Sequence, residues 1–324
     1  MRRRTLLGNA IGQNDFYNGL MFWFDGINTG KRKDSLIYTW IPKYVDASIA
    51  SIGTLDLKGR YRPELPSFQQ FWEYKQTQAG VDMRYSKKSS SSPVGEITPP
   101  EDAQRSYYCG MYSDINPFMP INNGDYTLIC LFSEADVKEI ISQKSSRNIE
   151  TVCPFGIAYE AADAESTAPW ISRTQFGFRF TSGDEGICMF NQLGPNNSNQ
   201  RVVWSMTPPN HINIGYMAFI REGNYVRIVA EIDGNMITGE PKLFEQDTML
   251  EQLRFTLGYY CYKAGYDEHG DADTSIMPDG SVAGDFNMPA IYHSITLHNR
   301  ALSNDEVITM MSKLKVRYGL NNNN

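Results

Sequence analysis

The chain has 324 residues, of which 41% are hydrophobic and 21% charged; this composition excludes global disorder and can bury a core without disulfides or metal. The formal net charge of −7 argues against a nucleic-acid-binding protein, because contacts to phosphate need clustered positive charge. The 19 Tyr, 16 Phe, 26 Gly and 16 Pro residues favour many short strands and turns over long helices.

Residues 1–15 are predicted to form an N-terminal arm. The arm begins Met-Arg-Arg-Arg, which we interpret as a tether to a larger assembly. Leu6-Leu7 is much shorter than the roughly 7–15 apolar residues of a secretory signal peptide, so we expect no export by that route. No run approaches the roughly 18–20 apolar residues of a membrane span, so we expect no membrane partner.

Strand signals then recur along most of the chain. Leu20–Phe24 is an apolar run that ends in the turn pair Asp25-Gly26. Later segments show period-two alternation, at 176–180, 225–232 and 291–298, or strand-like runs, at 126–132 and 253–261. No segment between them has the helical length that parallel crossovers need, so the strands are expected to be antiparallel. Residues 134–143 fit a helix or a strand equally well.

Residues 60–106 interrupt this pattern. They contain Lys87-Lys88, four consecutive serines at 89–92, and then Pro93 and the pair Pro99-Pro100. Such polar, proline-bearing composition predicts a long loop or inserted flap.

One helix is predicted at the C-terminal end. Ser303 and Glu306 form a capping box, in which each side chain satisfies a backbone N–H of the other residue. The apolar residues that follow recur at helical spacing (Val307, Met310, Met311, Leu314). Gly319 marks the stop, and 321–324 is a polar tail. The sequence therefore predicts an all-β, two-sheet antiparallel jelly-roll sandwich over residues 16–320, with a C-terminal helix.

The stretch 290–307, with its Asn299-Arg300-Ala301-Leu302-Ser303 core, resembles the closing motif of concanavalin A-like lectin/glucanase domains. It is most similar to the laminin-G/pentraxin-type branch. Weaker likenesses occur in the same order at 20–26, 125–129, 225–238 and 255–258. The resemblance implies a jelly roll that binds glycans through its loops.

This domain type, together with the Met-Arg-Arg-Arg start and the missing signal peptide, also resembles tailed-bacteriophage virion proteins. That resemblance implies a virion location after synthesis in the host cytoplasm. It also implies contacts with other virion proteins or with further copies of the chain.

Catalytic signals are sparse. Glu231-Ile232-Asp233 resembles part of the E-x-D-x-(x)-E strand of related glycoside hydrolases, but Asn235 and Met236 occupy the possible positions of the third acid and Gly234 turns the chain. No nucleophile elbow, P-loop or zinc-protease motif occurs. We therefore expect a protein that is not an enzyme: a capsid decoration, head fibre or tail fibre component. The alternatives are a glycoside hydrolase on the same fold and a purely architectural virion domain.

Loop residues provide the candidate binding sites. Exposed aromatic faces stack on sugars, and the aromatic residues of polar loops are Trp170, Tyr262 and Tyr266. Clustered loop carboxylates suit Ca²⁺, which would be an optional ligand and not a required cofactor; the four candidates are Asp271, Asp273, Asp279 and Asp285.

The remaining reactive residue types are interpreted as structural. Alternation puts His293 on one face with Ile295 and Leu297, as a core or rim histidine. Trp23 is expected in the core. The five cysteines form no CxxC pair and are interpreted as reduced, mostly buried thiols.

Overall fold

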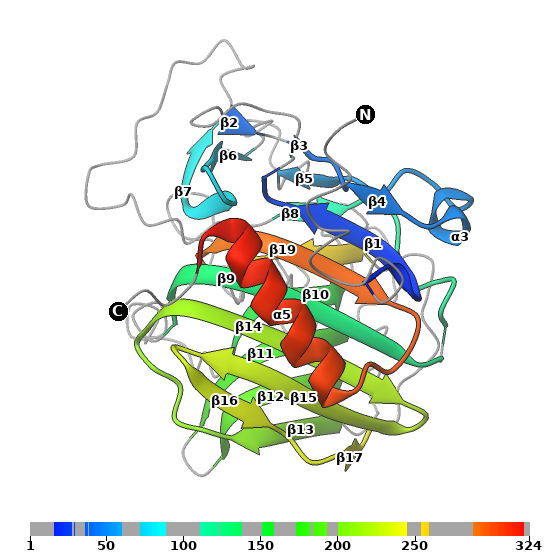
Figure 1. Ribbon diagram of the computed structural model, residues 1–324, viewed down its shortest axis with the longest axis vertical. Coiled ribbons are helices and arrows are strands. Elements are labelled where there is room, and N and C mark those ends of the chain that lie inside the picture. The colour runs from blue at the N-terminus through cyan, green and yellow to red at the C-terminus, as the bar shows by residue number, and fades with distance from the viewer. Residues whose placement is uncertain are drawn as a thin grey trace, which may run out of the picture.

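The computed structural model describes residues 16–27, 29, 36–37, 39–59, 72–88, 111–122, 124–137, 151–158, 173–181, 184–192, 200–244, 254–258 and 288–320. These residues form two antiparallel sheets stacked face to face, with one long helix against the larger sheet (Figure 1). The predicted fold class, a two-sheet antiparallel sandwich with a C-terminal helix, is confirmed.

The larger sheet has 11 strands, eight of them in the order β16-β15-β14-β9-β19-β7-β6-β2. In chain order its strands are β1 (Leu20–Asp25), β2 (Leu36–Ile37), β4 (Tyr44–Val45), β6 (Trp72–Gln76), β7 (Val81–Lys88), β9 (Tyr126–Asp136), β14 (His211–Glu222), β15 (Tyr225–Ile232), β16 (Asn235–Thr238), β17 (Lys242–Leu243) and β19 (Ile291–His298). One edge of β19 pairs with β9. Along its other edge, β19 pairs with β7 at Ile291–Tyr292 and with β1 at Ser294–His298.

The smaller sheet has 8 strands in the order β13-β12-β11-β10-β18-β8-β5-β3. They are β3 (Thr39–Trp40), β5 (Leu57–Gly59), β8 (Met111–Ser113), β10 (Thr151–Ala158), β11 (Arg173–Thr181), β12 (Asp184–Gln192), β13 (Gln200–Ser205) and β18 (Arg254–Leu257). The described helices include α3 (Ala47–Ala50) and α5 (Asn304–Tyr318).

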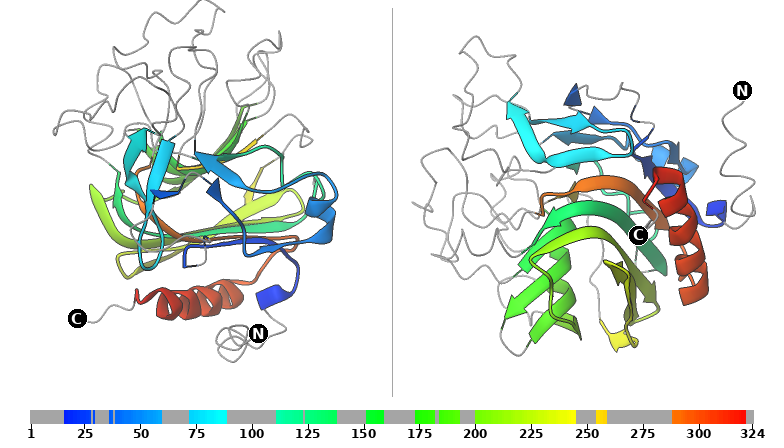
Figure 2. Two further views of the ribbon diagram at one scale, coloured as in Figure 1. Left: turned by 90° about the horizontal axis from the view of Figure 1, so that it is seen from above. Right: turned by 60° about the vertical axis from the view of Figure 1, so that its left-hand side comes forward.

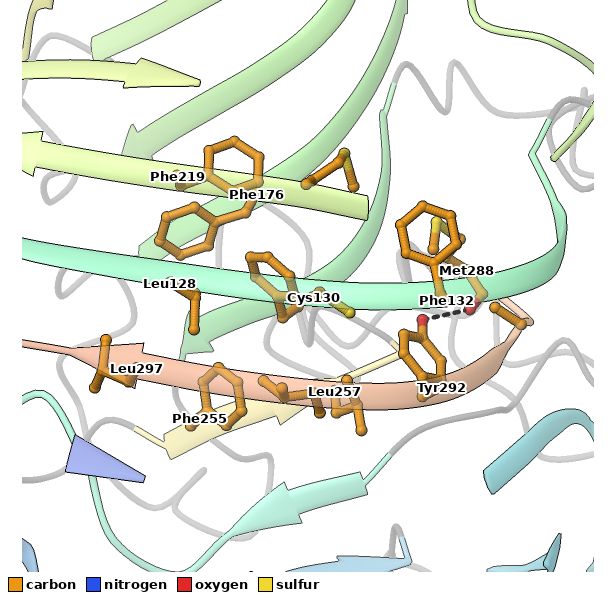
Figure 3. Packing of buried hydrophobic residues seen from close by; sticks show 14 of the residues in the cluster. Leu128, Cys130, Phe132, Phe176, Phe219, Phe255, Leu257, Met288, Tyr292 and Leu297 are labelled. Atoms are coloured by element: carbon orange, nitrogen blue, oxygen red, sulfur yellow. Dashed lines mark hydrogen bonds between the residues drawn. The ribbon is translucent and has the colours of Figure 1, made fainter. Parts of the chain in front are cut away.

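The main core lies between the sheets and is rich in aromatic rings (Figure 3). Phe219 of the larger sheet packs edge-on against Phe155 and Phe176 of the smaller one, with ring centroids 5.7 and 5.0 Å apart. Such contacts contribute about 0.5–1.5 kcal/mol beyond the area that they bury. Alternation along the strands thus determines which side chains join the two layers.

Helix α5 covers the opposite, outer face of the larger sheet (Figure 2). Its capping box is present, and Gly319 ends it with a left-handed φ of 68°. The helix packs its buried residues on the outward-facing side chains of β1, β9, β14 and β15. Because both faces of the sheet are covered, all six residues of β1 are buried, including Trp23 as predicted.

A β-bulge in β19 changes the predicted face of His293. The pairing of β19 with β9 shifts between Tyr292 and Ser294, so one extra residue is inserted there. Tyr292 and Ile295 point into the main core, while the His293 ring lies beside Tyr318 of α5. The prediction that His293 shares a face with Ile295 and Leu297 is wrong because strict alternation does not survive a bulge.

Two further segments differ from the pattern. Residues 60–106, expected as a loop or flap, contain the β6–β7 hairpin, which joins the larger sheet through β19. The ambiguous segment 134–143 begins as strand, since β9 runs to Asp136, and 138–143 lies outside the described residues. No helix within the described ranges is long and apolar enough to cross a membrane.

Candidate functional site

The candidate sites expected from the sequence lie outside the described residues. This holds for the ligand-binding aromatics Trp170, Tyr262 and Tyr266 and for the calcium candidates Asp271, Asp273, Asp279 and Asp285. Within the described part of the chain, no group of three or more His, Cys, Asp or Glu residues could hold a metal ion.

The acidic pair Glu231 and Asp233 has structural roles. Asp233 and Gly234 form the β15–β16 turn with positive φ angles of 48° and 81°. Asp233 Oδ1 accepts hydrogen bonds from the backbone N–H groups of Asn213 and Ile214, each at 2.9 Å. Glu231 forms an ion pair with Lys315 of α5. The hairpin interpretation of this segment is confirmed.

A polar cluster that the sequence did not indicate lies beneath the last turn of α5. We call Trp23, Asp25, Lys43, Arg317 and Tyr318 the Trp23 cluster. Period two places Trp23 and Asp25 of β1 on the same outer face. Lys43 precedes β4, which pairs with β1, and the last two residues of α5 complete the cluster.

Asp25 is the centre of this cluster and is 0% exposed. Its Oδ2 atom accepts from Lys43 Nζ at 3.0 Å and from Arg317 Nη2 at 2.5 Å. Its Oδ1 atom accepts from the Tyr318 hydroxyl at 2.8 Å and from the Ile27 N–H at 3.2 Å. A buried carboxylate needs such partners, so Asp25 fastens the end of α5 to the sheet.

The Trp23 ring lies beneath both cations. Lys43 Nζ is 4.4 Å and the Arg317 guanidinium carbon 5.4 Å from its ring centroid, both within cation–π range. The Trp23 indole N–H donates to Ser294 Oγ at 3.0 Å. The ring is therefore fixed in place while its surroundings are positively charged.

Burial and charge alter the acid–base properties of the cluster. Burial lowers the pKa of Lys43, and the charge of Arg317 lowers it further, against the opposing effect of Asp25. Burial, with the added charge of Asp25, raises the pKa of Tyr318 well above its usual value, so its hydroxyl stays a hydrogen-bond donor. The single carboxylate of Asp25 thus accepts hydrogen bonds from two cations and from the Tyr318 hydroxyl.

An exposed aromatic pair adjoins the cluster. Tyr17 is 43% exposed, and its ring meets that of Tyr44 edge-on at 5.9 Å. Tyr44 pairs with Trp23 across β1 and β4. We call Tyr17 and Tyr44 the Tyr17–Tyr44 surface.

A second polar group lies where β7, β9 and β19 meet. His293 Nε2 is 2.8 Å from Ser133 Oγ, and its Nδ1 is 2.9 Å from the carbonyl oxygen of Ala79. Burial lowers the pKa of His293 to about 4. A neutral ring that donates from Nδ1 and accepts at Nε2 satisfies both contacts, so the prediction of a satisfied structural histidine is confirmed.

Next to it, Arg84 joins two carboxylates. Its Nε and Nη2 atoms bind Asp82 at 3.0 and 2.8 Å, and its Nη1 atom is 3.4 Å from Glu134 Oε2. Glu134 has a positive φ of 52°, which costs free energy in a residue other than glycine. Two carboxylates and a strained backbone therefore occur together.

No protein-family model matches the sequence, and no curated protein matches it. Solved structures with a similar fold include Trypanosoma rangeli sialidase in complex with sialic acid, at 10% identity and a TM-score of 0.40 over 92% of this chain and 33% of that one. They also include an arabinofuranosidase complexed with arabinofuranosyl-alpha-1,2-xylobiose, at 12% identity and a TM-score of 0.42 over 90% of this chain and 61% of that one. Domains LG4-5 of the mouse laminin alpha1 chain match at 10% identity and a TM-score of 0.29, over 56% and 37%.

The match covers 33% of the length of the sialidase. At such identities the likeness concerns the fold alone. The prediction that the protein is not an enzyme is nevertheless contradicted, because sialidases and arabinofuranosidases are glycoside hydrolases. The missing E-x-D-x-E strand is therefore no ground for excluding catalysis.

Proposed function

We propose that this protein recognises glycans, and that the Tyr17–Tyr44 surface is one place where it does so. The observation that supports this is an exposed tyrosine held edge-on against a second tyrosine beside polar groups. Sugar rings stack their C–H faces on such aromatic surfaces, and a few polar groups orient them. Exposed Asn18 and the carboxylate of Asp46, which also caps α3, are polar groups close by in the sequence.

A glycan array with the purified protein tests this proposal. Tyr17→Ala is expected to weaken binding of a glycan that the array retains about fivefold, since an aromatic contact contributes about 1 kcal/mol. Tyr225→Ala is the matched control, because Tyr225 is also exposed, at 53%, but lies on β15. An array without any binding, or equal losses in the two variants, would contradict the proposal.

We further propose that the protein is displayed on the virion of a tailed bacteriophage, as a capsid decoration, head fibre or tail fibre component. The sequence resemblance to phage virion proteins supports this, as does a fold type that suits adhesion. The partners are other virion proteins and further copies of the chain. Electron microscopy of intact particles with a labelled antibody tests it: label on the head or tail is expected, and label absent from purified particles would contradict it. If the antibody labels the particles but the glycan array shows no binding, an architectural role in the virion is favoured.

Loop aromatics and calcium remain predictions of the same function. Trp170→Ala, Tyr262→Ala and Tyr266→Ala are expected to weaken glycan binding if these loops take part. Asp271→Asn with Asp273→Asn should remove any dependence of binding on calcium. Calorimetric titration with calcium measures this directly, and no heat in the unaltered protein would contradict the calcium prediction.

Glycoside hydrolysis is a second candidate function. The observation that favours it is the pair of carboxylates at Arg84, beside the strained backbone of Glu134, whose side chain is 45% exposed. Glycoside hydrolysis uses two carboxyl groups, one as acid and one as base or nucleophile. Release of reducing ends from array-positive glycans should fall at least about a hundredfold in Glu134→Gln, and not in Glu222→Gln, an exposed control on β14. Equal rates in both variants would exclude this site.

A further inference from the structure

The ion pairs beneath α5 differ in their charge balance. Lys315 meets one carboxylate, Glu231, over the ring of Tyr216, so that pair is neutral. In the Trp23 cluster, Lys43 and Arg317 share the single carboxylate of Asp25. Among the described residues, the groups whose charge acts on these two cations are Asp25, Tyr318 and the cations themselves, and the Tyr318 hydroxyl stays protonated. The described part of the cluster therefore carries one positive charge in excess.

Within the described part of the chain, the same two cations have hydrogen-bond donors that no protein acceptor occupies. Arg317 Nε is buried and has no acceptor among the described residues. Lys43 gives one hydrogen bond to Asp25, and an ammonium group has three hydrogens. A buried donor without a partner is costly, so this donor, at a site of excess positive charge, favours an anionic ligand that accepts a hydrogen bond.

The cluster is also reachable from the Tyr17–Tyr44 surface. The Lys43 side chain is 30% exposed and that of Arg317 17%. Lys43 directly precedes Tyr44, and Tyr44 lies opposite Trp23 on the neighbouring strand. A sugar ring stacked on the tyrosines would thus have a positively charged group beside it.

We propose that Lys43 and Arg317 bind the anionic group, a carboxylate or a sulfate, of an acidic saccharide whose ring stacks on the Tyr17–Tyr44 surface. This inference rests on the proposed glycan recognition and assigns the class of ligand. Charge-assisted hydrogen bonds from Lys43 and Arg317 hold the anion. Trp23 and Asp25 position the two cations without touching the ligand.

Calorimetric titration with a matched pair of sugars tests the assignment. The probes are a trigalacturonic acid and its neutral methyl ester, with sodium sulfate alone as the third. The acid is expected to bind at least about tenfold more tightly than the ester, and its affinity should fall as salt is added. Lys43→Gln should remove this preference while keeping the Arg317–Asp25 pair. Lys315→Gln, which removes the neutral pair on the same helix, should leave the preference unchanged.

A second readout separates binding from a purely structural role. Reductive methylation with labelled formaldehyde gives Lys43 an NMR signal whose pH titration reports its pKa. Bound acid should raise that pKa, whereas the neutral ester should not, because only a nearby anion stabilises the charged amine.

The outcomes distinguish this inference from the function on which it rests. Equal binding of acid and ester overturns the anion site but keeps glycan recognition. If sulfate binds in a manner that depends on Lys43 and neither sugar binds, the ligand is not a saccharide. This outcome overturns both the saccharide assignment and glycan recognition at this surface. A preference for the acid that survives Lys43→Gln, in a protein with unchanged thermal unfolding, places the anion elsewhere and overturns the assignment.

Discussion

The last turn of α5 contacts the larger sheet on two flanks. On one flank Arg317 reaches Asp25 of β1, and on the other Lys315 reaches Glu231 of β15. Asp25 is fully buried and accepts hydrogen bonds from Lys43, Arg317, Tyr318 and the Ile27 N–H, whereas the Glu231 side chain is 17% exposed and pairs with Lys315. The number of partners thus follows the depth of burial, because a carboxylate removed from water needs more of them.

Asp25→Asn is expected to cause the largest loss of stability on either flank. The variant leaves two cations close together without their anion, and breaking a buried pair costs about 3–5 kcal/mol. Denaturant unfolding monitored by fluorescence should show a loss of this size. A loss below about 1 kcal/mol would mean that Asp25 is not the anchor of α5.

Lowering the pH should cause the next largest loss of stability, through a histidine on the flank of α5 that contacts Asp25. His293 lies beside Tyr318, and its pKa in the folded protein is lowered from 6.5 to about 4. Because the unfolded chain binds the proton first, stability is complete above pH 6.5 and is lost as the pH falls towards 4. The loss amounts to about 3 kcal/mol for this one group.

Unfolding free energies at pH 6.5 and 4.5, for the unaltered protein and for His293→Gln, measure this. The variant should show a flatter pH dependence over that interval. Equal slopes would mean that His293 does not carry the acid sensitivity.

Glu231→Gln probes the weaker flank. Lys315 keeps some solvent and its stacking over Tyr216, so the expected loss is about 1 kcal/mol. Thermal and denaturant unfolding should both show it. A loss as large as that of Asp25→Asn would remove the proposed link between burial and partner number.

Lys43→Met should have the smallest effect. Arg317, Tyr318 and the Ile27 N–H still satisfy Asp25, and the methionine stem can cover Trp23, so about 0.5 kcal/mol is expected. A double-mutant cycle with Asp25→Asn isolates the coupling between the two residues. Coupling above about 2 kcal/mol would show that Lys43 is as necessary to the anchor as Arg317.

The regular parts of the fold could be predicted from the sequence. Alternation identified β15 and β19, and the capping box located the start of α5. These signals are local, since each depends on residues within one element. The β6–β7 hairpin was hidden because the composition of 60–106 is dominated by the polar residues that follow it.

The Trp23 cluster could not be found in the same way. Asp25 precedes a glycine and therefore has the sequence signature of a turn residue. Its partners Lys43 and Arg317 lie 18 and 292 positions away. Only a pairing across the sheet and the docking of α5 bring them together, and a single sequence carries no signal for either.

The position of β19 has a consequence for how the chain acquires its shape. Trp23 meets Ser294 across 271 residues, and β19 separates β1 from β9. During synthesis on the ribosome, β1 emerges early, and of the described strands only the short β4 can pair with it until residues 291–298 follow. Contacts of such sequence separation slow folding, so a nascent chain keeps the apolar Leu20–Phe24 run without its β19 partner for most of its translation.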